Sequence, residues 1–308
     1  MFAPSVVVFF LVYVMSFVLV VGVEDWMMVW IGLEMNMMSF VGMVLMKGDK
    51  GSVESGFSYF FVQSISSILF LVMVFCGGWV EMMLLVSVGA GPFFFWFISV
   101  MDGLSWGGCF MLMGFQSVLP LMLASGMIGG VVKVMGLMSV IIGGVGVFGQ
   151  VSMRKLLAYS SINHLGWILM GMMIGGGLWI LYFFVYLVVV GFLIGCLWKW
   201  GLMEVKGMSL EEGLVMVILM LSMGGVPPML GFVGKWMVFE EMVVLDFFSG
   251  VVMVIMSLVM IYVYLRVVYE GLSDGGHVGE INEEKNLCWW VVMMVLGSVG
   301  LPLIVFLY

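Results

Sequence analysis

Apolar stretches of about 20 residues recur along the whole chain, and the segments between them carry most of the charged residues. An apolar helix of that length can cross the hydrocarbon core of a bilayer. Of the 308 residues, 64% are hydrophobic and 9% are charged, which is too few charged groups to cover a soluble surface. Backbone groups in lipid need partners within their own segment, so these stretches should be helices. The sequence therefore predicts an all-α polytopic membrane protein.

Hydropathy and the flanking polar residues predict about eleven transmembrane helices within a single membrane domain, residues 1–308. Their approximate ranges are 5–23, 26–46, 57–77, 80–100, 104–124, 128–149, 155–174, 177–198, 213–234, 249–269 and 288–307. The first ten form two sets of five, about 5–124 and 128–270, and 288–307 is a C-terminal helix.

Two of these spans contain helix breakers, and they are five spans apart. One reads Val88-Gly89-Ala90-Gly91-Pro92-Phe93, and the other reads Met223-Gly224-Gly225-Val226-Pro227-Pro228. They are either kinked helices or discontinuous helices at equivalent places of two repeats, and discontinuous helices mark ion sites in transporters. We favour the second interpretation. An odd repeat length inverts topology, so we expect two inverted five-helix repeats, each with a discontinuous helix.

The basic residues predict the orientation of the chain. They gather in the loops after even-numbered spans, at Lys47, Lys50, Arg154, Lys155, Lys199, Lys206 and Lys285. Cytoplasmic or matrix loops carry such an excess of lysine and arginine. The N-terminus is therefore expected on the matrix (or cytoplasmic) side, and the C-terminus on the opposite side.

Of the ionisable residues within or beside predicted spans, where such groups are costly, three are candidate functional residues. Glu34 is either a proton-carrying acid or a structural acid bonded to Asn36. Lys235 follows the second break; it is either a proton carrier, since desolvation penalises its charged form, or a lysine snorkelling to the interface beside Trp236. Its charge could pair with Glu240 or Glu241. His164 is either a proton carrier or a hydrogen-bonded packing residue.

No pattern for a metal, haem or dinucleotide site stands out. The cysteines do not pair at CxxC spacing, and all four lie in apolar segments. There is no basic stripe for nucleic acid. The chain lacks threonine and holds 36 methionines, a composition that fits a strand-biased organellar gene.

Four segments together resemble the mitochondrial NADH dehydrogenase subunit 2 family, the antiporter-like subunits of respiratory complex I. They are Trp26–Asn36, Gly143–Gln150, Met153–Trp167 and Leu221–Trp236. The resemblance implies proton translocation across the mitochondrial inner membrane, coupled to electron transfer from NADH to ubiquinone. It also implies a mid-membrane hydrophilic axis with Glu34 and Lys235 as proton relays and His164 as a further position. NADH, FMN, iron–sulfur clusters and ubiquinone would belong to other subunits, and the partners would be other membrane-arm subunits and lipid.

The chain departs from this family at three positions where lysine is usual: Ser58, Ser87 and Ser117. Serine holds no proton charge, so an axis through Ser87 and Ser117 needs ordered water. One hypothesis is translation with the wrong mitochondrial code, so that these serines are truly lysines. The rival hypothesis is a lineage in which this subunit has weakened or lost pumping.

Two other functions remain open from the sequence. A subunit of a cation/proton antiporter complex shares the same ancestral fold. A non-pumping structural subunit of the same membrane arm would fit the loss of central lysines, whereas the retention of Glu34 and Lys235 argues against it.

Overall fold

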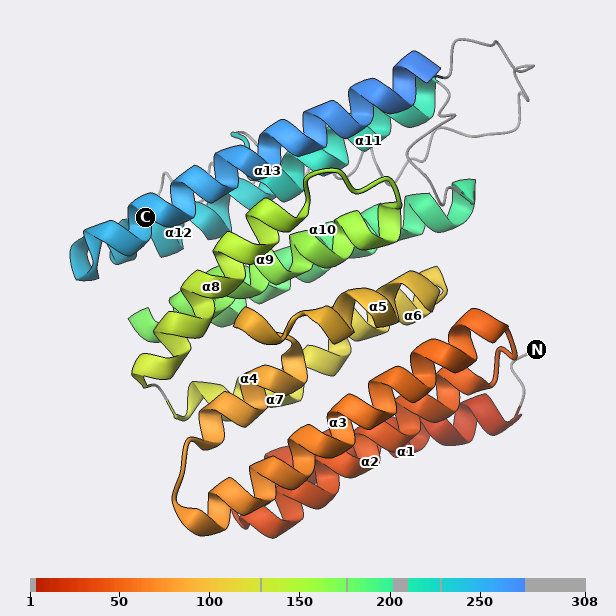
Figure 1. The fold of residues 1–308 in the computed structure, drawn as a ribbon, viewed down its shortest axis with the longest axis vertical. Helices are drawn as coiled ribbons and strands as arrows, with labels where there is room; N and C mark the ends of the chain where they lie inside the picture. The colour runs from red at the N-terminus through yellow and green to blue at the C-terminus, as the bar shows by residue number, and fades with distance from the viewer. Residues whose placement is uncertain (1–3, 128, 176, 202–209, 228, 275–308) are drawn as a thin grey trace. The chain divides into compact units, whose positions relative to one another are not determined.

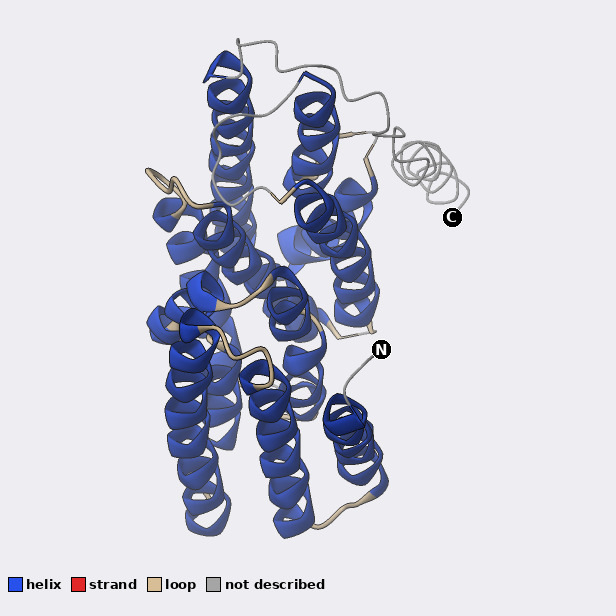
Figure 2. Ribbon diagram, turned by 90° about the vertical axis from the view of Figure 1, so that its right-hand side faces the viewer, coloured by secondary structure: helices blue, strands red, loops and turns tan. Residues whose placement is uncertain are grey.

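The computed structural model describes residues 4–127, 129–175, 177–201, 210–227 and 229–274. Within these ranges the regular structure is helical and no β-strand occurs, as Figures 1 and 2 show. The predicted all-α class is confirmed. The chain forms two compact units that divide between Met138 and Ser139, inside one helix.

The first unit is built around the long helix α3. Its elements are α1 (Pro4–Gly22), α2 (Trp26–Leu45), α3 (Lys50–Cys76), α4 (Val80–Val88), the 3-10 helix η1 (Gly91–Phe93), α5 (Phe95–Gly103), α6 (Trp106–Met113), α7 (Phe115–Ser125) and the start of α8 (Gly130–Gly146). Helices α1, α2 and α3 pack in sequence order (Figure 1), and α3 also contacts α4 and α5.

Tyr59 of α3 joins four helices of this unit. Its ring packs edge-on against Phe40 of α2, with centroids 4.9 Å apart, and against Trp96 of α5 at 5.9 Å. Its hydroxyl accepts a hydrogen bond from the Gln116 amide of α7. The side chain is 1% exposed, so an aromatic ring with a polar tip fills the centre of the unit without leaving its hydroxyl unpaired.

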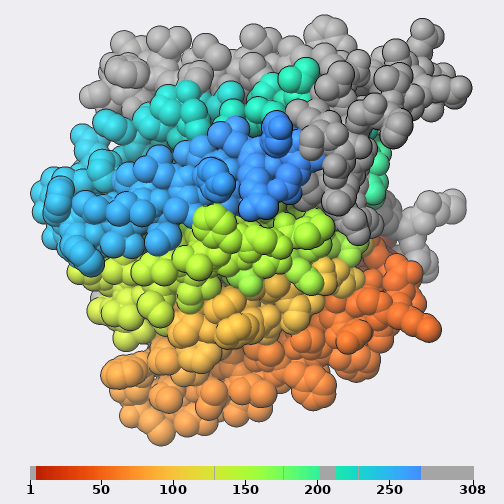
Figure 3. All heavy atoms as spheres, turned by 45° about the horizontal axis from the view of Figure 1, so that its top comes forward, coloured from red at the N-terminus to blue at the C-terminus, as the bar shows by residue number. Residues whose placement is uncertain are grey.

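The second unit encloses its most polar helix. Its elements are α9 (Met153–Ile174), α10 (Leu178–Trp200), α11 (Leu210–Gly224), α12 (Leu230–Leu245) and α13 (Phe247–Asp274). Helix α9 contacts α10 and α12, and α13 lies against α11 and α12, as the blue and cyan surfaces in Figure 3 show. Ser160, Ser161, Asn163 and His164 of α9 are all buried, so protein shields them from lipid.

Within the described residues, several helices are long and apolar enough to cross a membrane, as the prediction of a polytopic helical protein requires. By length and apolarity six described helices qualify: α1, α2, α3, α6 with α7, α10 and α13. The bent pair α4–α5 makes a seventh if it is one span. Helices α8 and α11 are apolar but shorter. The expected C-terminal helix, 288–307, lies outside the described residues.

Three predicted spans are interrupted in the structure, and the interruptions of 80–100 and 213–234 fall at the predicted helix breakers. The span 80–100 bends by 89° between α4 with η1 and α5. The span 104–124 is interrupted at Gly114, which separates α6 from α7. The span 213–234 ends as a helix at Gly224, and a new helix runs from Leu230 to Leu245, past the predicted end. The interruption at Gly114 was not predicted, because hydropathy averaged over a window runs across a break whose flanking residues stay apolar.

Glycines make both predicted breaks possible. Gly89 ends α4 with a φ of 83°, and Gly225 follows α11 with a φ of 78°, a region that favours glycine. Beyond the second break, a Cβ on Gly231 would collide with the carbonyl oxygen of Ser222. The missing side chain at Gly231 therefore allows α12 to start directly against the end of α11.

Replacing Gly231 with alanine should separate these two helix ends. We expect Gly231→Ala to lower the free energy of unfolding by about 1–3 kcal/mol, because the new methyl group meets rigid backbone. The measurement is the midpoint of thermal loss of helical circular dichroism in detergent. Gly195→Ala is the matched control, since a Cβ there meets open space and alanine favours a helix. Equal midpoints for Gly231→Ala and the unsubstituted chain would contradict the close approach.

Candidate functional site

Lys235 holds the carboxyl end of the broken helix α11. It lies on the second turn of α12 and is 7% exposed. Its Nζ donates to the carbonyl oxygen of Gly224 at 2.7 Å and to that of Met223 at 3.3 Å. The last carbonyls of a helix have no partner within it and carry partial negative charge, so an ammonium satisfies both needs.

This geometry bears on the two interpretations of Lys235. The side chain is buried and turned to the break, which argues against the alternative of a lysine snorkelling to the interface. Glu240 and Glu241 are exposed, and in the described chain the lysine bonds to the two backbone carbonyls rather than to either acid. A cation at a half-helix end is the arrangement that transporters use to hold ions.

Aromatic side chains surround the lysine. Its Nζ lies 5.8 Å from the ring centroid of Trp167, within the range of a cation–π contact. Trp167 stacks on Tyr182 of α10 with an interplanar angle of 3°, and both rings are buried. The cation is thus enclosed by groups that stabilise its charge without supplying a counter-charge.

His164 is connected to the same cluster through Tyr182. Its Nδ1 lies 2.8 Å from the Tyr182 hydroxyl, and its ring packs against Tyr186 with centroids 5.0 Å apart. His164 and Trp167 are three residues apart on α9 and face the same side. The structure therefore brings His164 and Lys235 into one cluster.

A small hollow separates the polar groups of this cluster. It has a volume of about 10 Å³, close to the least that holds one water molecule. His164, Tyr182 and Ser222 line it. Met223, whose carbonyl accepts a hydrogen bond from Lys235, and Gly234, which precedes Lys235 in the chain, also line it. One water there would have several hydrogen-bonding partners.

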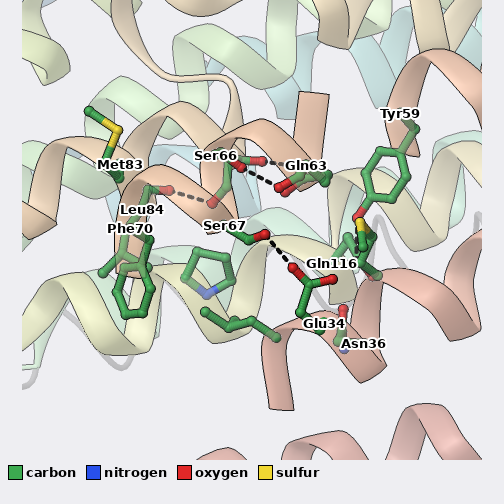
Figure 4. Close-up of a pocket in the computed structure, with 14 residues that line it drawn as sticks. Glu34, Asn36, Tyr59, Gln63, Ser66, Ser67, Phe70, Met83, Leu84 and Gln116 are labelled. Atoms are coloured by element: carbon green, nitrogen blue, oxygen red, sulfur yellow. Dashed lines mark hydrogen bonds between the residues drawn. The ribbon is translucent and has the colours of Figure 1, made fainter. Parts of the chain in front are cut away.

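The first unit holds Glu34 beside a separate cavity. This cavity has a volume of about 40 Å³, and its lining contains Glu34, Gln63, Ser66, Ser67, Ser87 and Gln116 but no lysine, arginine or histidine (Figure 4). The Glu34 carboxylate is half-buried and accepts a hydrogen bond from the Ser67 hydroxyl. Ser67 Oγ also lies 3.0 Å from the carbonyl oxygen of Ser64.

Asn36 does not bond to Glu34. Its amide donates to Ser16 Oγ at 3.1 Å and so joins α2 to α1. As a structural acid, Glu34 would therefore be bonded to Ser67 of α3 rather than to the predicted Asn36. The carboxyl group faces hydroxyls and a cavity that has room for water, which suits a group that takes up and releases a proton.

The carbonyls at the first break have neutral donors. Gln63 Nε2 donates to the carbonyl oxygen of Ser87 at 2.6 Å, and Trp96 Nε1 donates to that of Val86 at 3.3 Å. No described lysine occupies this helix end. The two breaks thus solve the same hydrogen-bonding problem differently, with neutral donors at α4 and a cation at α11.

The three serines at the family's lysine positions lie at different places. Ser87 lines the Glu34 cavity, and its hydroxyl bonds back to the carbonyl of Leu84 at 2.7 Å. Ser117 is buried and bonds back to Gly114 at 2.7 Å, one turn before the cavity-lining Pro120. Ser58 is half-buried on α3 and does not line the cavity. Of the three, Ser87 is the one placed beside Glu34.

Sequence reasoning missed several residues of these sites. Gln63, Ser64, Ser66 and Ser67 form a polar run inside an apolar span, a signal that was available in the sequence. Tyr182 gave no such signal, because it is one aromatic among many in its span. Among the described residues no group of three or more histidine, cysteine or acidic side chains could hold a metal ion.

Comparison with known proteins places this architecture in a family. The model of the NADH:quinone oxidoreductase/Mrp antiporter transmembrane family matches residues 72–261, which include both breaks, His164 and Lys235. NADH-ubiquinone oxidoreductase chain 2 of Anopheles gambiae is 32% identical and covers 91% of this chain and 87% of its own length. The protein of that name from Locusta migratoria is 29% identical, with 90% and 89% covered.

Solved structures share the fold. A chain of respiratory complex I from Thermus thermophilus with bound aureothin matches with a TM-score of 0.82 at 19% identity, over 98% of this chain and 79% of that one. A chain of the Mrp complex from Dietzia sp. matches with a TM-score of 0.73 at 16% identity, over 88% and 60%. Multiple apolar helices, two broken helices and a matched family model over most of the chain therefore make this a multi-pass membrane protein of the NADH:quinone oxidoreductase/Mrp antiporter family.

Proposed function

We propose that this chain is a membrane-arm subunit of NADH:ubiquinone oxidoreductase and that it translocates protons through Lys235. Relatives that carry the name of that enzyme's chain 2 match most of the chain at about 30% identity, which supports this assignment. The enzyme would be the H+-translocating NADH:ubiquinone reductase, with NADH, FMN, iron–sulfur clusters and ubiquinone bound by other subunits.

The observation that carries the proposal is the bond between Lys235 and the end of α11. When charged, the ammonium donates to the carbonyls of Met223 and Gly224. When it loses a proton, it loses the charge that the partial negative end of the helix attracts. The proton can pass to water in the adjoining hollow, and from there to the free nitrogen of His164. Protonation of Lys235 thereby changes how firmly α12 holds α11.

Glu34 supplies a second proton site in the first unit. Its carboxylate can accept a proton from cavity water, and the Ser67 hydroxyl can turn to accept the resulting O–H. Ser87 and Ser117 are further positions on the same proposed axis. The segments of about 5–124 and 128–270 would then be inverted five-helix repeats, each with one discontinuous helix.

The proposed setting is the mitochondrial inner membrane. The loop charges favour a matrix-side N-terminus and an opposite C-terminus. The partners would be the other antiporter-like and small helical subunits of the arm, with lipid around the exposed apolar faces.

A cation/proton antiporter subunit is the second candidate. It has a specific observation in its favour, because the family model and the Mrp-complex fold include such proteins. Co-purification separates the two candidates: respiratory subunits with bound flavin and iron–sulfur clusters support the first, and an assembly without them supports the second.

Substitutions at Lys235 test whether its proton or only its charge matters. Lys235→Met should lower coupled proton translocation by about tenfold or more, because the relay group is lost. Lys235→Arg keeps a cation for the two carbonyls but cannot release its proton, so the complex should assemble and still fail to translocate. The assay is acidification of proteoliposomes during NADH oxidation. If Lys235→Arg translocates protons as well as the unsubstituted chain does, Lys235 acts only as a fixed charge that caps α11.

The hydroxyl of Tyr182 should control how His164 exchanges protons. Tyr182→Phe keeps the ring that stacks on Trp167 and removes the bond to Nδ1, which contributes about 0.5–1.5 kcal/mol. We expect a roughly two- to tenfold slower turnover and a displaced pH–rate profile. Tyr262→Phe, on the exposed side of α13, is the matched control. An unmoved pH profile for Tyr182→Phe, like that of the control, would remove Tyr182 from the relay.

Whether residues 58, 87 and 117 are serine or lysine can be determined on the natural protein. Peptide mass spectrometry of the purified chain distinguishes serine from lysine at positions 58, 87 and 117. Lysine at position 87 would start a long cationic side chain at the wall of the Glu34 cavity and complete a charge pair there. Serine at all three positions rejects miscoding and leaves the first unit to work through hydroxyls and water.

A further inference from the structure

A surface hollow in the first unit is not used by the proposed proton sites. It has a volume of about 170 Å³ and lies between α2 and the start of α6. It is smaller than the pockets of about 300–1,000 Å³ that hold whole drug-sized ligands. Its size therefore suits one flexible chain rather than a bulky ligand.

The walls of the hollow change from apolar to polar along α2. Phe40, Met43, Val44 and Lys47 line it at the spacing of one helix face. The three apolar side chains lie within the span, and Lys47 lies just after the helix ends at Leu45. Met111 and Leu104 add further apolar wall from the side of α6. A hollow with this gradient runs from hydrocarbon depth to the level of lipid headgroups.

The polar end of the hollow carries a positive charge, and no acidic side chain lines it. Lys47 is exposed, and its ammonium donates to the Ser105 hydroxyl. Ser52 and Ser105 supply the other polar side chains of the lining, which contains no carboxylate. On a chain of net charge −8, such a place attracts an anion rather than another basic group.

We propose that this hollow binds an anionic phospholipid, with the phosphate on Lys47 and one acyl chain along Phe40, Val44 and Met111. The ammonium forms the charge-assisted bond, and the Ser105 hydroxyl donates a second bond to the phosphate. The apolar wall contacts part of the acyl chain in place of bulk lipid. Charge complementarity distinguishes this occupant from a zwitterionic lipid and from an apolar protein segment.

Gly107 gives the means to close the hollow. Gly107 lines it, and a Cβ at that position meets no other atom within 4 Å. Gly107→Leu therefore projects into the hollow without disturbing helix packing. Gly195→Leu is the matched control, because Gly195 also lies on a helix with open space at its Cβ and is on α10, away from the hollow. Lys50→Gln controls for Lys47→Gln, since Lys50 is a nearby exposed lysine outside the lining.

The test uses the intact complex in phosphatidylcholine nanodiscs with a trace of photoreactive lipid. Photoreactive phosphatidylglycerol should label the peptides around residues 40–47 and 104–111, and photoreactive phosphatidylcholine should label them less. Lys47→Gln should lower phosphatidylglycerol labelling roughly fivefold, the effect of about 1 kcal/mol per surface lysine. Gly107→Leu should abolish labelling by both lipids, while the two controls leave it unchanged.

Three outcomes would overturn the proposal. Equal labelling by both lipids that Lys47→Gln does not alter would mean that bulk acyl chains fill the hollow. Labelling that Gly107→Leu leaves intact would place the lipid elsewhere. Absence of label from these peptides in the unsubstituted complex would mean that a neighbouring subunit covers the hollow.

Discussion

The carboxyl end of a helix broken inside a membrane needs hydrogen-bond donors that lipid cannot supply. In the second unit one side chain, Lys235, donates to the last two carbonyls of α11. It reaches them because Gly225 turns the chain back and Gly231 lets α12 approach the backbone of Ser222. The break, the two glycines and the buried cation therefore depend on one another, and a change in the charge of the lysine acts directly on the contact between two helices.

The first unit meets the same need without a charge. Gln63 and Trp96 donate to the carbonyls at the end of α4, so that helix end keeps its partners whatever the pH. In this unit, Glu34 instead lines the same cavity as Ser87 and accepts a hydrogen bond from Ser67. Under our proposal, proton-dependent movement belongs to the second break, and the first unit stores a proton beside a helix end that stays in place.

Ionisable residues are rare within or beside apolar spans and are therefore conspicuous in the sequence. Glu34, His164 and Lys235 could be selected on this ground. Their partners could not be predicted, because Ser67 and Tyr182 meet them only through tertiary packing. The predicted span 213–234 ends just before Lys235, and this made snorkelling a plausible alternative. Helix α12 continues to Leu245, which keeps the lysine inside.

The most direct measurement is a structure of the assembled complex at a resolution that shows ordered water around Lys235. Our account predicts a water in the hollow of His164, Tyr182 and Ser222, within hydrogen-bonding reach of the lysine ammonium or linked to it by one further water. Such a chain would give the proton a route between the broken helix and the histidine. A hollow closed by side chains, with Lys235 fixed on both carbonyls in every state of turnover, would contradict a relay and leave the lysine as a structural cap.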